Sequence, residues 1–274
     1  IFVRCDYNGN WIVRCLMDEI FGKENFRNEI TINRTQEFFK SPGKGSKKYM
    51  WDTDSLFLFA KSEDNLFNQL LVGREKEVWR EPFLPSKNKP ENDFRTVFEE
   101  KIYSPPGRKW GLTQEAINEL MEEKRIQNTN GKIEYLPQHK KLKDNWTDIP
   151  GYQRNWGFQT ENSEILLKRV IETGSNQGDL ILDFFLGSGT TTAVAHKLGR
   201  KWIGVEMGEH FYDVILPRMK KVLAYDKSGI SKEVKEYQGG GFFKYYELEQ
   251  YEETLANCKY EDGDLFTSPS KTPY

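Results

Sequence analysis

The chain has few cysteines, almost no net charge and no long hydrophobic run. Its three cysteines, at 5, 15 and 258, are scattered and odd in number, which argues against a disulfide framework or a zinc site and fits a reducing cytoplasm. No apolar stretch approaches the roughly 18 residues that a membrane helix requires. A net charge of -2 gives no whole-chain argument for a polyanionic partner. We therefore expect a cytoplasmic protein without a metal site or membrane span, and any case for nucleic-acid binding must come from motifs.

The order of the apolar patterns predicts an α/β protein with an inserted module. A strand, helix, strand pattern occupies 1–62, and a polar, proline-containing stretch follows at 63–150. The α/β pattern returns at 151–226, and a C-terminal extension occupies 227–274. Alternation of this kind is typical of Rossmann-like sheets covered by helices.

Local signals predict several individual elements. Thr113 is placed to cap a helix over 114–125, and Asn130-Gly131 lies between alternating residues as in a two-residue hairpin. Pro217 is expected to kink or reset the last core helix. Gly22 is expected to end a helix whose apolar residues share one face, namely Trp11, Val13, Leu16, Met17 and Ile20.

A glycine turn follows a buried strand in LILDFFLGSGTT, residues 180–191. Gly187 and Gly189 allow the backbone to turn sharply and approach a ligand, and a helix beginning near Thr190 presents free N–H groups. A second strand ends at Glu206, 23 residues beyond Asp183, which suits a carboxylate that accepts hydrogen bonds from ribose hydroxyls. The pattern predicts a small-molecule site.

Three classes of ligand use a turn of this kind. A triphosphate loop requires a lysine after its last glycine, and Thr190 stands there instead. A dinucleotide site favours a third glycine where this chain has Thr192. S-adenosylmethionine remains, with Asp183 near its amino end and Glu206 on its ribose. The alternative interpretation is a turn that serves packing alone.

Several motifs resemble those of the amino-methylating DNA methyltransferases of the permuted beta order, in particular the modification enzymes of type III restriction systems. DFFLGSGTT at 183–191 resembles their D-P-F-x-G-S-G-T-T motif, with Phe184 in place of proline. FQTENSEILLKRVI resembles their T-x-K-P element, with Asn162 and Ser163 in place of lysine and proline. The opening of the chain is similar to their strand, helix and strand, and 107–127 and 145–152 are similar to parts of their target-recognition region.

The resemblance implies a Rossmann-like core that uses S-adenosylmethionine, with an inserted target-recognition module. The implied reaction methylates an exocyclic amino group in double-stranded DNA, adenine N6 above all, within a restriction-modification system. A second copy of the chain and a restriction subunit are further partners that it implies. The residues that it places at the cofactor are Asp183, Phe184, Phe185, Gly187, Ser188, Gly189, Thr190, Glu206, Thr160 and Asn162.

The loop that grips the flipped base in this family is not recognisable in the sequence. That loop reads Asp, Asn or Ser, then Pro-Pro, then an aromatic residue, and in the permuted order it precedes the strand at 1–5. Ser104-Pro105-Pro106-Gly107 has the first three letters, but Gly107 cannot stack on a base, and a rigid turn is favoured. We therefore expect a C-terminal fragment that is inactive alone and lacks the central strand of its sheet; its catalytic residues stay unknown.

Basic clusters are the candidates for DNA contact, since cations neutralise phosphates and an aromatic ring can stack or wedge. The alternative for each cluster is an ordinary solvated surface. The loop at 38–50 is another candidate because it carries Lys40, Lys44, Lys47 and Lys48. The clusters comprise Arg108, Lys109 and Trp110, then Lys140, Lys141 and Lys143, and finally Arg154.

Two other classes of function remain open. One is a DNA-binding specificity subunit or degenerate methyltransferase without catalysis, and the other is an RNA or protein methyltransferase. The three histidines, at 139, 196 and 210, are too dispersed for a metal site or catalytic triad, and we assign them no chemistry.

Overall fold

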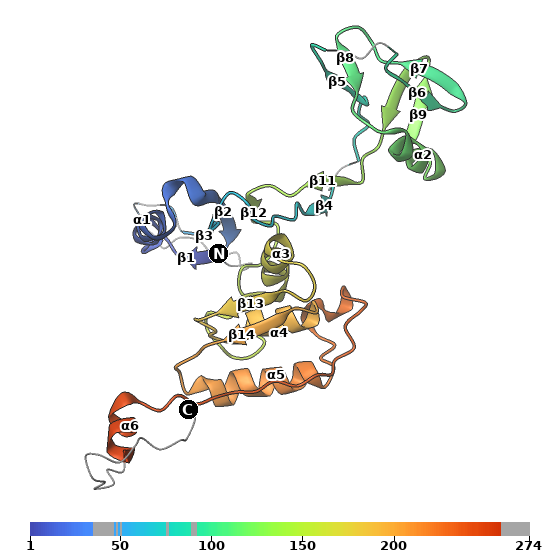
Figure 1. Cartoon of the computed structure of the whole chain (residues 1–274). Helices are drawn as coiled ribbons and strands as arrows, with labels where there is room; N and C mark the ends of the chain where they lie inside the picture. The colour runs from blue at the N-terminus through green and yellow to red at the C-terminus, as the bar shows by residue number, and fades with distance from the viewer. Residues whose placement is uncertain (35–46, 48, 50, 75–76, 89–91, 259–274) are drawn as a thin grey trace, which may run out of the picture. The chain divides into compact units, whose positions relative to one another are not determined.

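The computed structural model describes residues 1–34, 47, 49, 51–74, 77–88 and 92–258. Its contacts divide the chain into a first unit, 1–239, and a second unit that begins at Gly240. The described helix of the second unit is α6 (Tyr251–Asn257). The first unit contains both sheets and helices, so the predicted α/β class is confirmed (Figure 1).

A four-stranded sheet is built mainly from the N-terminal residues. It contains β1 (Phe2–Cys5), β2 (Phe26–Asn33), β3 (Thr53–Phe59) and β12 (Asn145–Trp146), in the order β1-β3-β2-β12. β3 pairs antiparallel with both β1 and β2, whereas β12 runs parallel to β2. The alternating apolar residues of β2 and β3 face a core that includes Ile30, Ile32 and Leu56.

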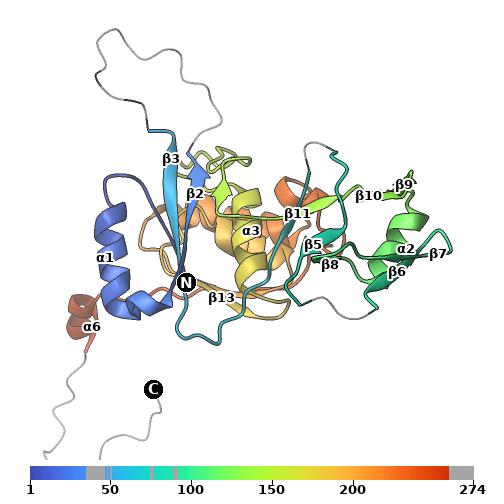
Figure 2. The same ribbon diagram turned by 90° about the horizontal axis from the view of Figure 1, so that it is seen from above.

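Helix α1 (Asn10–Phe21) forms as predicted and runs beside this sheet (Figure 2). Gly22 ends it with φ of 86°, a left-handed conformation that favours glycine. Met17 packs against Phe57 and Phe59 of β3. Most of the apolar face, however, is exposed: 66% for Trp11, 49% for Leu16 and 70% for Ile20.

The residues between the core segments form a small module with its own hydrophobic core. This core contains Val97, Trp110, Ile117, Ile126 and Ile133. Strands β4 and β11 pair with each other where the chain enters and leaves the module. The elements are β4 (Leu71–Gly73), β5 (Phe83–Pro85), β6 (Phe94–Val97), β7 (Glu100–Tyr103), β8 (Arg108–Trp110), α2 (Gln114–Glu122), β9 (Ile126–Thr129), β10 (Lys132–Tyr135) and β11 (His139–Lys141).

Three local predictions are confirmed in this module. The Thr113 hydroxyl accepts from the Ala116 N–H at 3.3 Å and caps α2. Asn130 and Gly131 have positive φ and connect β9 to β10 as a hairpin. Ser104 to Gly107 forms a turn between β7 and β8, in which the Arg108 N–H donates to the Pro105 carbonyl at 3.1 Å. The Pro-Pro pair is therefore a turn element.

A second, parallel sheet holds the glycine motif. β13 (Leu180–Asp183) pairs with β14 (Lys201–Gly204), and α4 (Thr190–Lys197) connects them (Figure 1). The segment after β14 begins as a short π-helix at Phe211–Ile215 and continues as α5 (Leu216–Leu223), so Pro217 resets the helix as predicted. Two short 3₁₀ helices, Lys23–Asn25 and Gly229–Lys232, are the other helical elements of the described unit.

Helix α3 (Glu164–Gly174) connects the cores of the two sheets. Its Leu166 belongs to the cluster of Ile30 and Ile32, and its Ile171 packs with Val194 of α4. In the described ranges, β1 and β13 share no hydrogen-bonded ladder and belong to separate sheets. One side of the parallel sheet is open, since Leu180 and Leu182 are each 59% exposed, and Ile203 is exposed beside them.

A buried ionic cluster joins α3 to α4. The ammonium group of Lys197 lies 2.9 Å from Glu164 and 2.8 Å from Asp226, and it also donates to the Ser228 carbonyl at 3.1 Å. Burial alone would raise the pKa of Asp226. The hydrogen bonds from Lys197 and Ser228 outweigh that effect and lower the pKa from 3.8 to about 2.

We expect Asp226→Asn to remove an acid-sensitive part of the stability. Because folding lowers the pKa of Asp226, its contribution is complete above pH 3.8 and is lost as the pH falls through about 2. The variant should be less stable at neutral pH by roughly 1 to 2 kcal/mol, and this difference should shrink across that window. Chemical unfolding of both proteins at several pH values measures it, and a difference that stays constant with pH would contradict the assignment.

Candidate functional site

The glycine turn lies at the carboxyl end of two paired parallel strands. Asp183 of β13 stands opposite Gly204 of β14. The Val205 N–H donates to the Asp183 carbonyl at 2.9 Å, and the Leu186 N–H donates to the Val205 carbonyl at 3.0 Å. These bonds extend the ladder into the turn, at the edge of a parallel sheet where ligands commonly bind.

The conformation of the turn depends on its two glycines. Gly187 and Gly189 have φ of 55° and 75°, which other residues adopt only with strain. The hydroxyls of Ser188 and Thr190 point inward, because both residues are buried and their oxygens lie 3.0 Å apart. What the turn can offer a ligand is therefore its backbone.

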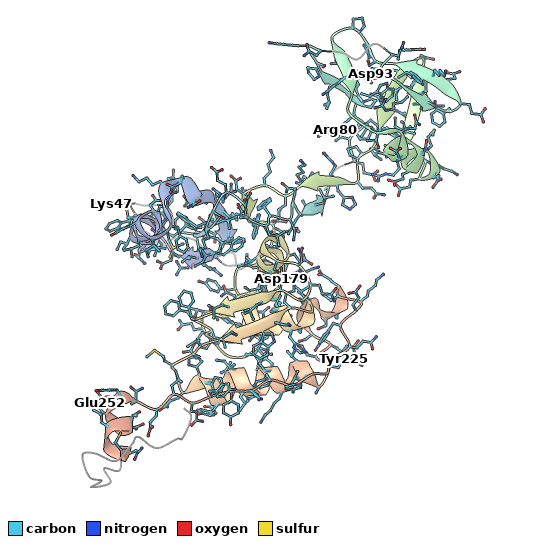
Figure 3. The ribbon with its side chains drawn as sticks, viewed as in Figure 1. Lys47, Arg80, Asp93, Asp179, Tyr225 and Glu252 are labelled. Carbon is cyan, nitrogen blue, oxygen red and sulfur yellow. The ribbon has the colours of Figure 1, made fainter. Side chains whose placement is uncertain are left out.

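Phe184 and Phe185 are the exposed side chains of the motif. Their rings contact each other with centroids 4.9 Å apart, and Phe185 is 84% exposed. The Asp183 carboxylate accepts from the Phe185 N–H at 3.1 Å, which fixes its orientation at the end of β13. Asp179, which Figure 3 labels, directly precedes this strand.

Glu206 lies directly across the turn from β13. Its Oε2 accepts from the Gly187 N–H at 2.7 Å, and its Oε1 accepts from the N–H groups of Met207 and Gly208, each at 2.9 Å. A carboxylate has about four acceptor positions, and three backbone N–H groups use three of them, so the group as a whole can accept one further hydrogen bond. Burial raises the pKa of Glu206, but the backbone hydrogen bonds and His210 together lower it below its ordinary value.

His210 and Phe158 lie beside this carboxylate. Sequence reasoning assigned no chemistry to His210 and favoured a packing role over adenine stacking for Phe158. The His210 Nε2 lies 3.1 Å from the Gly187 carbonyl and 3.5 Å from Glu206. The rings of His210 and Phe158 have centroids 5.0 Å apart. The one sequence signal was the spacing of four residues between Glu206 and His210, which brings side chains together in a helical turn.

The segment at 160–163 connects the turn to the N-terminal sheet. The Asn162 side chain accepts from Arg4 of β1 at 2.5 Å, and its carbonyl accepts from the Thr190 hydroxyl at 3.2 Å. Ser163 caps α3 by accepting from the Leu166 N–H at 3.2 Å. Thr160 is exposed. Asn162 and Ser163, which replace the expected lysine and proline, thus have structural partners of their own.

The predicted DNA-contacting residues lie in different environments. Lys140 and Lys141 are exposed on β11, and Lys109, Lys143 and Arg154 are exposed in or near the module. Arg108 is paired with Glu81 at 2.5 Å, which neutralises its charge locally.

Trp110 requires a correction. It is only 5% exposed, packs on Phe83 and donates its indole N–H to the Ile102 carbonyl, while its backbone N–H bonds to Asp93, which Figure 3 labels. A ring held in the module core in this way is not available to wedge into DNA. Of the lysines predicted in the 38–50 loop, Lys40, Lys44 and Lys48 lie outside the described residues; Lys47 is exposed.

The donor set suits an organic ligand with hydroxyl and cationic groups. Two carboxylates, Asp183 and Glu206, flank a backbone turn, and two pairs of rings lie near it, Phe184 with Phe185 and Phe158 with His210. In the described part of the chain, no three His, Cys, Asp or Glu side chains gather closely enough to bind a metal ion. Within the same ranges, every helix is too short or too polar to traverse a bilayer.

Comparison with known proteins identifies the family. The chain is 26% identical, over 93% of its length, to the probable type III restriction-modification enzyme HindVI Mod subunit of Haemophilus influenzae, of which it covers 45%. It is 28% identical, over 71% of its length, to the type II methyltransferase M.EcaI of Enterobacter cloacae, of which it covers 47%. The chain thus spans about half the length of the curated relatives that it matches.

A solved structure and a family profile complete the comparison. The crystal structure of an M1.HpyAVI-SAM complex aligns with a TM-score of 0.43 and 16% identity, over 80% of this chain and 72% of that one. Residues 1–217 match the family described as DNA methylase. Because that match covers most of the sequence, the chain belongs to the DNA methylase family.

Proposed function

We propose that this chain is the cofactor-binding part of a site-specific DNA methyltransferase of a restriction-modification system. It uses S-adenosylmethionine to methylate an exocyclic amino group, adenine N6 in the first instance. The observation that carries the proposal is the pair of carboxylates, Asp183 and Glu206, on either side of a left-handed glycine turn at the end of a parallel ladder. Membership of the DNA methylase family supports a reaction on DNA.

The residues of the turn match the groups of S-adenosylmethionine. The remaining acceptor capacity of the Glu206 carboxylate suits a ribose hydroxyl, and the negative charge of Asp183 suits the cationic amino-acid end. Phe158 and the exposed Phe185 supply apolar surface for the adenine ring. When bound, the cofactor supplies an electrophilic methyl group on a sulfonium; the protein orients it and excludes water.

The open surfaces of the structure support a site that another polypeptide segment completes. One face of the β13–β14 sheet exposes Leu180, Leu182 and Ile203, and α1 exposes Trp11 and Ile20. Exposed apolar surface of this extent marks an interaction site in soluble proteins. A further polypeptide segment that packs on these apolar faces and carries the base-gripping Pro-Pro loop would cover them and supply the contacts to the target base.

A DNA-binding specificity subunit without catalysis is the second candidate. It is favoured by one observation: the Pro-Pro pair in the sequence ends in Gly107 and forms a turn between two strands of the module. The two candidates differ in one result. A methyltransferase transfers methyl groups once the base-gripping segment is added, whereas a specificity subunit still transfers none.

Glu206→Gln should weaken the binding of S-adenosylmethionine by about 10- to 100-fold, because a neutral amide replaces a charged acceptor of a ribose hydroxyl. Isothermal titration calorimetry measures the dissociation constant. Glu209→Gln is the matched control, since Glu209 is exposed three residues away. Equal dissociation constants for the two variants would remove Glu206 from the cofactor site.

Methyl transfer tests the need for a completing segment. Labelled S-adenosylmethionine and unmethylated plasmid DNA are incubated with the 274-residue chain, and in parallel with a chain extended at its N-terminus by the segment that carries the Pro-Pro loop. We expect transfer by the extended chain alone, and none after its loop is mutated. Transfer by the short chain would overturn the need for completion, whereas binding to DNA without transfer in both would favour the specificity subunit.

The lysines of β11 should contribute to DNA affinity through phosphates. Neighbouring residues of a strand point to opposite faces, so Lys140 and Lys141 lie on the two faces of the β4–β11 ribbon and can reach both walls of a groove. Replacing both by alanine should lower the slope of log affinity against log salt by about 2. Fluorescence anisotropy at several salt concentrations measures this slope.

The matched control replaces two exposed lysines outside the module, Lys232 and Lys235. We expect this double variant to retain the slope of the unmodified chain. If both double variants change the slope equally, the effect reflects total charge and the ribbon is not the DNA-contacting surface.

A further inference from the structure

Arg218 of α5 lies buried behind the glycine turn. Its Nη1 donates to the Ser188 carbonyl at 3.1 Å and to the Thr190 hydroxyl at 2.9 Å. Both acceptors belong to the motif predicted to bind the cofactor. The side chain is 1% exposed, so Arg218 acts on the turn from the interior and does not reach the ligand surface.

The same guanidinium binds the other predicted cofactor segment. Nη1 lies 3.3 Å from Glu161, which follows Thr160 directly, and Nη2 lies 3.2 Å from Glu164 at the start of α3. Glu161 is itself fully buried and accepts from the Trp156 N–H at 3.0 Å and from Gln153 at 2.8 Å. One side chain therefore connects the glycine turn to the 160–163 segment.

Stability alone is a weak explanation for a buried arginine. Buried ion pairs often contribute little net stability, because desolvation offsets much of their attraction. The Nε of Arg218 has no hydrogen-bond acceptor among the described residues, and a buried donor without an acceptor costs about 1 to 3 kcal/mol. The planar guanidinium of arginine does, however, direct its N–H groups at fixed angles to several acceptors at once. This suggests that the residue serves to hold those acceptors in position.

We infer that Arg218 is a positioning residue for the cofactor site: it fixes the backbone of the turn and the 160–163 segment relative to each other. The inference rests on the proposed binding of S-adenosylmethionine. Its physical basis is that the turn offers a ligand its backbone, so the affinity depends on where Ser188 and its neighbours are held. Loss of the Arg218 bonds would free the Ser188 carbonyl and let the turn sample other conformations.

Lys197 provides a matched control within the same ionic cluster. It is as buried as Arg218 and also binds Glu164, at 2.9 Å. Its other partners are Asp226 and the Ser228 carbonyl, and among the described residues none of its hydrogen bonds reaches the turn. Replacing either cation by methionine leaves Glu164 with one partner fewer, but only the Arg218 change removes the bonds to Ser188 and Thr190.

The experiment compares Arg218→Lys, Arg218→Met and Lys197→Met in the full 274-residue chain. Calorimetry gives the dissociation constant of S-adenosylmethionine, thermal melting gives stability, and hydrogen exchange without ligand follows the peptide that covers 186–191. We expect both methionine variants to melt at lower temperature. Only the Arg218 variants should bind at least about tenfold more weakly and exchange faster in the turn. Arg218→Lys keeps a charge beside Glu161 and Glu164, so it remains informative if Arg218→Met does not fold.

Each outcome decides the inference. The inference is overturned if Arg218→Lys has the same dissociation constant for S-adenosylmethionine, and the same hydrogen-exchange rate in the turn, as the unmodified chain. Equal losses of affinity in the Arg218 and Lys197 variants would also overturn it. If the unmodified chain binds no S-adenosylmethionine, the proposed function fails. Hydrogen exchange then still shows whether Arg218 holds the turn, and a turn that exchanges alike in all variants would reject that role as well.

Discussion

Glu164 is the buried carboxylate to which the helices around the glycine turn are attached. It accepts from Lys197 of α4 and from Arg218 of α5, and its Oε2 also accepts from the Ile230 N–H at 3.0 Å. Its own helix, α3, packs on the cores of both sheets. A carboxylate this deep is tolerable only with such partners. The position of the turn therefore follows from charge pairing in the interior as much as from the strand ladder.

The exposed apolar surfaces of the β13–β14 sheet and of α1 arise because each element is packed on one side only. In the parallel sheet, Ile181 and Trp202 pack toward α3 and α4, while Leu180, Leu182 and Ile203 on the other side remain exposed. Strands of parallel sheets are normally covered on both faces. The apolar residues of α1 show the same one-sided packing, with Met17 on β3 and Trp11 outside. Both surfaces therefore consist of large apolar side chains, which are usual in a hydrophobic core, but these side chains are exposed to solvent.

What could be predicted from the sequence was local. The strand, turn and helix at 180–197 follow from hydrophobic pattern and glycine placement, and the acid at the end of β14 follows from spacing. Thr113 and Asn130-Gly131 were predictable for the same reason, since caps and hairpin turns depend on a few adjacent residues.

The contacts between distant residues were not predictable from pattern. Arg218 stands in LPRMKKVL, which reads as an ordinary amphipathic helix with surface cations, and nothing in it points to Ser188, 30 residues earlier in the chain. Trp110 shows the converse error: neighbouring basic residues suggested a DNA contact, but the module required a large apolar side chain to fill its core. Small domains have few such residues, so an aromatic next to cations is often used for packing.

The contacts that shape the glycine turn involve the proposed binding of the methyl donor and leave the binding of the target base to another part of the protein. The bonds that shape the turn come from 153–230, through Glu161, Glu164, Glu206 and Arg218. None of them requires the strand that would carry a base-gripping loop. A cofactor site assembled in this way can form before the target base binds, because folding of this one segment stabilises the conformation of the turn. Two kinds of contact link this segment to the N-terminal sheet: Leu166 of α3 packs with Ile30 and Ile32, and Asn162 accepts from Arg4 on β1. These contacts are where placement of the base and placement of the methyl donor would have to be matched.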